Sequence, residues 1–138
     1  MPGLAWMLDT DTLSSLVRDP RNAVFDRLLA IEPEAACTSI VVACELRFGA
    51  RRKGSRVLTL RVGQLLGAMA VLPLDAPADA HYADIRAALE RAGKPIGNND
   101  LLIAAHARSR DLTLVTHNVR EFRRVPGLRV EDWLAASP

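Results

Sequence analysis

The sequence has no feature that would mark a membrane-spanning or exported protein. Its longest apolar run, residues 65–74, contains Gly67 and is broken by Pro73, and it is far shorter than the roughly 20 residues that cross a bilayer. The first ten residues lack both the basic segment and the apolar segment of a secretory signal peptide. We therefore expect a cytoplasmic protein that makes no contact with a membrane.

Cysteine is scarce as well. The two cysteines, Cys37 and Cys44, are seven positions apart and form no CxxC pair, which argues against a zinc site and against a redox motif. Thiols of cytoplasmic proteins are normally reduced. We expect both residues to pack in the core, where cysteine behaves as a small apolar side chain.

Lysine is nearly absent, since only two of the 18 basic residues are lysine, and the net charge is +2. Six basic residues and no acid lie between positions 47 and 61. Because arginine makes bidentate contacts with phosphate, this stretch is a candidate nucleic-acid footprint. Alternatively, a genome of high GC content encodes arginine in place of lysine, and the stretch is a solvated helix face. Both interpretations remain open. The residues of the candidate footprint are Arg51, Arg52, Lys53 and Arg56.

The rest of the composition is that of an ordinary globular domain. Of the 138 residues, 49% are hydrophobic and 25% are charged. A chain of this length buries roughly two-thirds of its unfolded surface. There is no internal repeat, low-complexity tract or linker, so we expect one domain over residues 1–138, with its core at about 7–133 and with Met7 as an alternative start to Met1.

Short apolar runs alternate with segments of helical spacing. We expect strands at residues 5–8, 35–40, 70–74, 112–115 and 128–133. We expect a helix that Thr12 caps and that runs to about residue 17, and further helices over residues 23–31, 41–52, 55–69, 78–93 and 98–109. Gly93 and one of Asn98 and Asn99 are expected as caps of the last two. Alternating strands and helices predict an α/β fold with a mostly parallel central sheet flanked by helices. Continuous apolar strands such as residues 112–115 are typical of parallel sheets that are buried on both faces.

This topology places several polar side chains at one edge of the sheet. Ligands of open parallel sheets bind outside the carboxyl ends of the strands. Asp9 follows the first strand, and the polar residues from Thr116 to Asn118 follow the strand at 112–115. Asp100 begins the helix that leads back to that strand, and Glu45 lies in the second turn of the helix that leaves the second strand. We therefore expect these residues to converge.

Each of these residues also has a purely structural explanation. Asp9 and Asp100 are suitable helix-capping residues. Glu45 is harder to explain in this way. Its helical neighbours, Val41, Val42, Phe48 and Gly49, place it on an apolar stripe that we expect to face inward, and a buried Glu needs a partner. We expect His106 to be a core histidine, whereas the role of His117 stays open.

Three carboxylates from separate segments, expected at one edge of the sheet, indicate a metal site. Two carboxylates about 4 Å apart repel by roughly 4 kcal/mol at an effective dielectric constant near 20. A fold keeps such a cluster only if something offsets this repulsion. Oxygen ligands without cysteine or organised histidine select a hard cation, Mg²⁺ or Mn²⁺, of the kind used in phosphate chemistry.

Four segments, in order and spacing, resemble PIN-domain ribonucleases, and most closely the VapC toxins of bacterial toxin–antitoxin pairs. They are "MLDTDTLSSLVRDP", "TSIVVACELRFGA", "PIGNNDLLIAAHARSRDLTLVTHNVREF" and "RVPGLRVEDW". The resemblance extends from Met7 to Trp133. It implies a PIN fold, Mg²⁺-dependent endonucleolytic cleavage of RNA such as tRNA or rRNA, and inhibition by a VapB-type antitoxin. It also implies a homodimer that can enter a larger toxin–antitoxin assembly.

The resemblance gives roles to the acids. Asp9, Glu45 and Asp100 fall on the family's acidic positions, and Asp9 and Asp100 are its usual metal ligands, which Glu45 would join. The family's fourth acidic position is Asn118 here. If Asn118 starts a helical turn, Glu121 shares its face, and we expect Glu121 to supply the missing carboxylate while Asn118 contacts the RNA or a bound water.

Two alternatives differ in class from a ribonuclease. "DTDTL" at residues 9–13 partly fits haloacid-dehalogenase-like phosphatases, with Asp9 as nucleophile. That family's glycine and threonine are absent at Thr12 and Leu13, and Lys94 lies only six residues before Asp100. The other alternative is a catalytically inactive module that binds RNA or a partner and keeps its acids for structural reasons.

Overall fold

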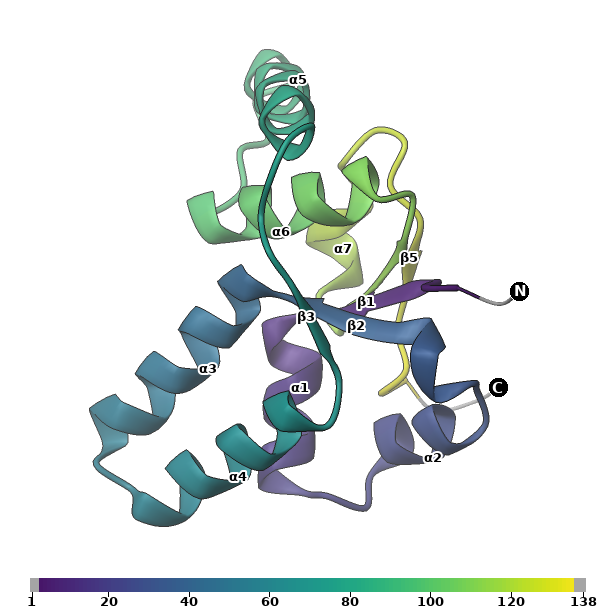
Figure 1. The fold of residues 1–138 in the computed structure, drawn as a ribbon. Helices are drawn as coiled ribbons and strands as arrows, with labels where there is room; N and C mark the ends of the chain where they lie inside the picture. Colours follow the sequence, from purple (N-terminus) through teal and green to yellow (C-terminus); the bar gives the residue numbers. More distant parts are fainter. Residues whose placement is uncertain (1–2, 136–138) are drawn as a thin grey trace.

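The computed structural model describes residues 3–135, so that Met1, one of the two candidate starts, lies outside the described residues. These residues form a five-stranded sheet with the strand order β3-β2-β1-β4-β5 (Figure 1). All four strand pairs are parallel, which confirms the predicted α/β class. The strands are β1 (Trp6–Leu8), β2 (Ala36–Ser39), β3 (Ala70–Leu72), β4 (Thr113–Val115) and β5 (Val130–Glu131).

Helices connect the strands and cover the sheet. In the view of Figure 1, α5 and α6 lie above the sheet and α1, α2 and α4 below it, while α3 and α4 form a hairpin that extends away from the strands. No helix among residues 3–135 is long and apolar enough to cross a membrane. The helices are α1 (Thr10–Arg18), α2 (Ala23–Leu29), the 3-10 helix η1 (Pro33–Ala35), α3 (Ile40–Lys53), α4 (Arg56–Gly67), α5 (Ala78–Arg91), α6 (Asn98–Ser109) and α7 (Val119–Phe122).

Helix α1 begins earlier than predicted. Asp9, not Thr12, is its N-cap, and the Asp9 carboxylate accepts a hydrogen bond of 3.0 Å from the backbone N–H of Thr12. Thr12 instead lies buried in the first turn, where its hydroxyl donates to the carbonyl of Val115 at 3.2 Å. The apolar pattern located the helix correctly. The predicted cap was wrong, because Asp9, which directly follows β1, already caps the helix.

The start of α6 was also mispredicted. Its N-cap is Gly97, which makes no side-chain capping bond. The side chains of Asn98 and Asn99 are therefore available for contacts with other elements. At the end of α5, the predicted role of Gly93 is confirmed to within one residue, because Gly93 follows the C-cap with a φ of 69° that favours glycine.

The core lies on both sides of the central strands. Met7, Leu8, Leu114 and Val115 are fully buried, as expected for a parallel sheet covered by helices. His106 is fully buried too, with its Nδ1 2.8 Å from the hydroxyl of Ser39, so the expectation of a core histidine is confirmed.

The expectation for the cysteines is only half right. Both thiols are free, and Cys37 is buried in β2, where burial raises its pKa to about 12. Cys44 is exposed, because it lies on the outer face of α3 and not on the face that packs on the sheet.

The burial of β4 gives a test of the fold. Leu114→Ala removes a fully buried side chain from the centre of the sheet and should lower the free energy of unfolding by about 2–5 kcal/mol. Leu29→Ala removes a side chain of α2 that is 70% exposed and should change it by less than about 0.5 kcal/mol. Urea denaturation followed by circular dichroism measures both values, and equal losses would contradict the assigned core.

Candidate active site

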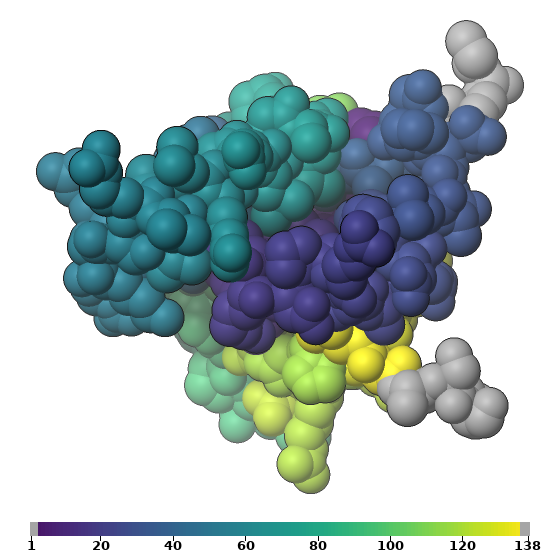
Figure 2. Space-filling view, turned by 90° about the horizontal axis from the view of Figure 1, so that it is seen from below, coloured from purple at the N-terminus to yellow at the C-terminus, as the bar shows by residue number. Residues whose placement is uncertain are grey.

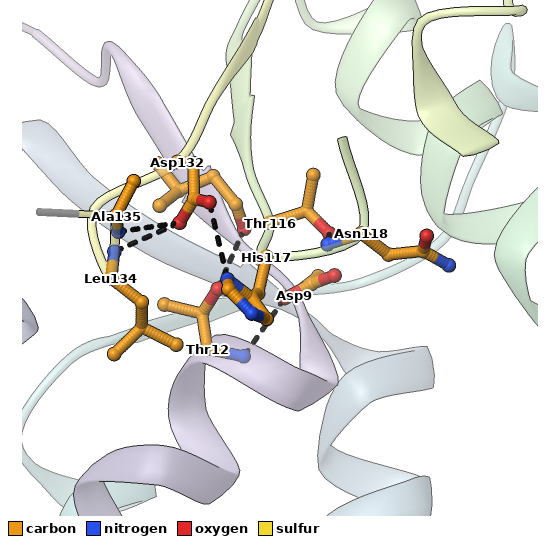
Figure 3. A network of polar contacts seen from close by, with 9 residues as sticks. Asp9, Thr12, Thr116, His117, Asn118, Asp132, Leu134 and Ala135 are labelled. Carbon is orange, nitrogen blue, oxygen red and sulfur yellow. Dashed lines mark hydrogen bonds and ion pairs between the residues drawn. The ribbon is translucent and has the colours of Figure 1, made fainter. Parts of the chain in front are cut away.

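The site lies where the strand order changes direction. From β1 the chain proceeds to β2 and β3 on one side, whereas β4 and β5 extend the sheet on the other side of β1. Such a switch point opens a crevice at the carboxyl ends of the two central strands. Asp9 follows β1 and Asn118 follows β4, and Figure 3 shows both at this edge together with Thr116.

Asp9 is held rigidly at the bottom of the site. Its side chain is almost fully buried, at 4% exposure, and its backbone N–H donates to the carbonyl of Val115 at 2.9 Å. Burial raises the pKa of Asp9, and hydrogen bonds from Thr116 and Thr12 offset part of this rise. The carboxylate thus has a fixed position at the end of β1 but is disfavoured in its charged form.

Asp100 lies in the first turn of α6 and is half-buried. Its pKa is raised to about 7, first by burial, then by a side-chain hydrogen bond and the charge of Glu121, and finally by the charges of Glu45 and Asp9. Acids from four different parts of the chain therefore influence one another here. The structure brings together the carboxylates that the sequence placed at this edge.

Glu45 lies at the boundary between the core and the solvent. The prediction that it faces inward on an apolar stripe is partly wrong, because Phe48, about one turn further along α3, is 64% exposed. Helix α3 reaches beyond the sheet with α4, so only one narrow face of it is covered. Two neutral donors hold the carboxylate of Glu45, namely the hydroxyl of Thr10 and, at 3.3 Å, the amide of Asn99.

Asn118 and Glu121 share a face of α7, as the i and i+3 spacing predicted. The amide of Asn118 donates to the Glu121 carboxylate at 2.7 Å, and its backbone N–H donates to the Thr116 hydroxyl at 3.0 Å. Glu121 also reaches Asp100 with its side chain. Glu121 could instead have paired with Arg124 on the surface, but among residues 3–135 the two form no ion pair.

The basic residues of the α3–α4 hairpin are divided between two grooves. One groove, of about 180 Å³, is lined by Glu45, Arg18, Arg52 and Lys53, among others. A second, of about 510 Å³, is lined by Arg51 and Arg56, together with Arg47. The four residues of the candidate footprint therefore line two different grooves. Figure 2 shows the hairpin, in blue-green, projecting beside the purple α1–α2 region.

These basic side chains are free to contact a partner. Within residues 3–135, no ion pair involves the four residues of the candidate footprint. The guanidinium group of Arg52 lies 5.8 Å from the ring centroid of Phe48, and the exposed Val57 and Leu60 of α4 lie near the same end of the hairpin. The hairpin thus combines positive charge with exposed apolar side chains.

Three neutral or basic residues of the site were not predicted from the sequence. Thr10 and Asn99 contact Glu45, and Arg18 shares the groove of Glu45. Thr10 and Asn99 each adjoin a predicted acid in the sequence, and that adjacency was the available signal. Their contacts join positions 35 and 54 residues apart, which no local pattern reveals.

The donor set fits a hard divalent cation. All the converging side chains offer oxygen atoms. The pKa of Asp100 is raised first by burial and then by the neighbouring acids, and a cation would offset both effects. Within residues 3–135, no three His, Cys, Asp or Glu side chains stand close enough to enclose an ion by themselves. The residues therefore suit an ion that takes few protein carboxylates and keeps several waters, and not one that needs a closed cage.

Comparisons with known sequences show the family of this chain. The family model described as "PIN domain" matches residues 6–128. A tRNA(fMet)-specific endonuclease VapC of Salmonella typhimurium is 37% identical over 131 residues, which cover 94% of this chain and 98% of that protein. The protein of the same name from Shigella flexneri is 40% identical over 131 residues, with the same coverage.

Solved structures lead to the same family. The DNA-bound VapBC of Salmonella typhimurium matches with a TM-score of 0.86 and 37% identity, covering 94% of this chain and 98% of that one. VapBC2 of Rickettsia felis, bound to a DNA fragment from its promoter, matches with a TM-score of 0.89 and 30% identity, covering 94% and 99%. A PIN fold, the acids at its switch point and full-length relatives thus agree, and the chain belongs to the PIN-domain family and, within it, to the VapC ribonucleases.

Proposed function

We propose that this chain is the toxin of a toxin–antitoxin pair, which cleaves RNA endonucleolytically with Mg²⁺ in the cytoplasm. The observation that carries the proposal is the convergence of Asp9, Glu45 and Asp100 at the carboxyl edge between β1 and β4, where burial first, then Glu121, and then the charges of Glu45 and Asp9 raise the pKa of Asp100. Relatives at 37% and 40% identity are named tRNA(fMet)-specific endonucleases, so tRNA is the first substrate to test and rRNA the second. Residues 1–138 would act as a single PIN domain.

In this proposal the acids bind a divalent metal ion. PIN-domain nucleases depend on a divalent metal ion, and the oxygen-only donor set favours Mg²⁺, with Mn²⁺ as a substitute. Asp9 and Asp100 would bind it, with Glu45 beside them. When bound, the ion supplies positive charge at the phosphate and lowers the pKa of water in contact with it.

The remaining side chains would complete the acidic site and orient the RNA. Asn118 cannot contribute negative charge, but Glu121 is within its hydrogen-bonding reach and interacts with Asp100. We assign to Glu121 the carboxylate that is missing at position 118. The amide of Asn118 would keep Glu121 in place and present its other hydrogen-bonding groups to the RNA.

The basic hairpin would bind the RNA backbone and the inhibitor. Arg52 and Lys53 line the groove that also contains Glu45, so RNA phosphates along this groove would lead to the acids. Arg51 and Arg56 would extend the contact around the hairpin. A VapB-type antitoxin segment with acidic and apolar side chains would compete for this surface. A homodimer that joins the antitoxin in a larger assembly completes the proposal.

The phosphatase alternative for Asp9 is not supported. The chain matches the PIN model over residues 6–128. In the structure Asp9 is nearly buried, caps α1 and adjoins the other acids. A phosphatase mechanism gives no role to Glu45. An inactive RNA-binding module would keep the fold and lose cleavage, which the following experiment detects.

RNA cleavage should depend on the two metal-binding aspartates. Asp9→Asn and Asp100→Asn keep the size of each side chain, remove the charge and should reduce the rate of cleavage at least a hundredfold, by analogy with about 10²–10³ for one transition-state donor. Sequencing of RNA 5′ ends after a short pulse of expression gives the substrate and the cleavage site. Asp26→Asn, on the exposed face of α2, should cleave like the wild type. Full cleavage in excess EDTA would refute the mechanism.

The metal-free protein should lose stability as the pH rises. The pKa of Asp100 is about 7 in the folded protein against 3.8 ordinarily, so the folded state binds the proton more tightly than the unfolded state. This stabilisation is complete below about pH 4 and is lost as the pH rises through 7. In EDTA, the Tm of the wild type should fall between these values. That of Asp100→Asn should fall less, and Mg²⁺ at pH 8 should restore the wild type more than this variant. Identical pH profiles would refute the coupling.

The four basic residues of the candidate footprint should set the salt dependence of RNA binding. Each phosphate contact to a single strand contributes about 0.7 to the slope of log K against log salt, so replacing all four by Ala should flatten it by about 2.8. Arg110→Ala, at the opposite edge of the sheet, should leave it unchanged. Fluorescence anisotropy in the Asp9→Asn background measures binding without cleavage. An unchanged slope would assign the four residues to a solvated face.

A further inference from the structure

The contacts of Glu45 differ from those of the other acids. Each of its two carboxylate oxygens accepts a hydrogen bond from a different neutral side chain, Oε1 from the hydroxyl of Thr10 and Oε2 from the amide of Asn99 at 3.3 Å. Thr10 directly follows Asp9 and Asn99 directly precedes Asp100. The two contacts therefore connect α3 with α1 and α6, the helices whose first turns adjoin the two aspartates.

Neither donor is needed to cap its own helix. Thr10 is the first residue of α1, which Asp9 caps with its own side chain. Asn99 lies in the first turn of α6, whose N-cap, Gly97, has no side chain. Among residues 3–135, the bond to Glu45 is the only side-chain hydrogen bond that either donor makes. A role in helix initiation therefore does not explain these two side chains.

The neutrality of the donors matters for the chemistry. Arg18, Arg52 and Lys53 line the same groove as Glu45, yet within residues 3–135 Glu45 forms no ion pair. A basic partner would fix the carboxylate but would also cancel its charge. A hydroxyl and an amide fix its position and leave its full negative charge available to a cation.

We propose that Thr10 and Asn99 are positioning residues, which hold the carboxylate of Glu45 in place and thereby set the affinity of the site for its divalent cation. The inference rests on the proposed function and deepens it, because it assigns a role to two residues that act through Glu45. Residues that orient the ligands of a metal typically change its affinity roughly tenfold to a hundredfold when they are removed.

The test is a double-mutant cycle on the full chain without RNA. The measured quantity is the affinity for Mn²⁺, which electron paramagnetic resonance determines. Thr10→Val removes the hydroxyl at nearly constant volume and should weaken Mn²⁺ binding about tenfold or more, while Thr10→Ser should restore it. In the Glu45→Gln background, Thr10→Val should change the affinity less than about twofold, because its effect acts through that carboxylate. Ser109→Ala, which removes a hydroxyl at the far end of α6, should have no effect in either background.

Equal losses from Thr10→Val in both backgrounds, or a Thr10→Ser variant as weak as Thr10→Val, would overturn the inference. If Thr10→Val does not fold, as judged by circular dichroism, Asn99→Ala provides the same cycle at an exposed position. The outcome is separate from that of the proposed function. If the effects of Thr10→Val and Glu45→Gln on Mn²⁺ affinity are coupled but the wild type cleaves no RNA, only the proposed function is refuted. If the wild type cleaves RNA but the two effects are independent, only this inference is refuted.

Discussion

The parallel pairing of β1 with β4 is the constraint on which the site depends. The register sets Leu8 opposite Val115, and the backbone N–H of Asp9 continues the ladder by donating to the carbonyl of Val115. This pairing joins segments more than 100 residues apart and makes both of them end at one edge. A shift of the register would separate Asp9 from the residues that follow β4, and no helix packing would restore the cluster.

The cluster is maintained against its own electrostatics. Burial and like charge disfavour the ionised forms of Asp9 and Asp100, and the fold tolerates this because backbone pairing and helix capping hold the acids in place. The surrounding polar groups are neutral, namely threonine hydroxyls and asparagine amides. They restrict the carboxylates geometrically without neutralising them. A bound cation, as we propose, would supply the positive charge that these neutral groups do not.

Charge of the opposite sign lies further out, on the α3–α4 hairpin. Helix α3 starts at the carboxyl end of β2, carries Glu45 in its second turn and ends in three consecutive basic residues. At about 1.5 Å per residue, Arg52 lies roughly 10 Å beyond Glu45 along the helix. One helix thus connects the acidic centre to the basic surface, and the exposed apolar side chains of the hairpin add a face suited to a protein partner.

The sequence alone determined the order of the elements and the edge at which the acids meet. Runs such as residues 112–115 and 55–69 gave a strand and a helix close to their observed bounds, because hydrophobic periodicity is a local property, and the topology of parallel sheets then located Asp9, Glu45 and Asp100. Local patterns did not determine the caps of α1 and α6, the exposure of Phe48 and Cys44 or the division of the basic residues between two grooves. Nor did they reveal that Thr10 and Asn99 hold Glu45. Those features depend on which surfaces of different helices meet, and only the packing of the tertiary structure decides that.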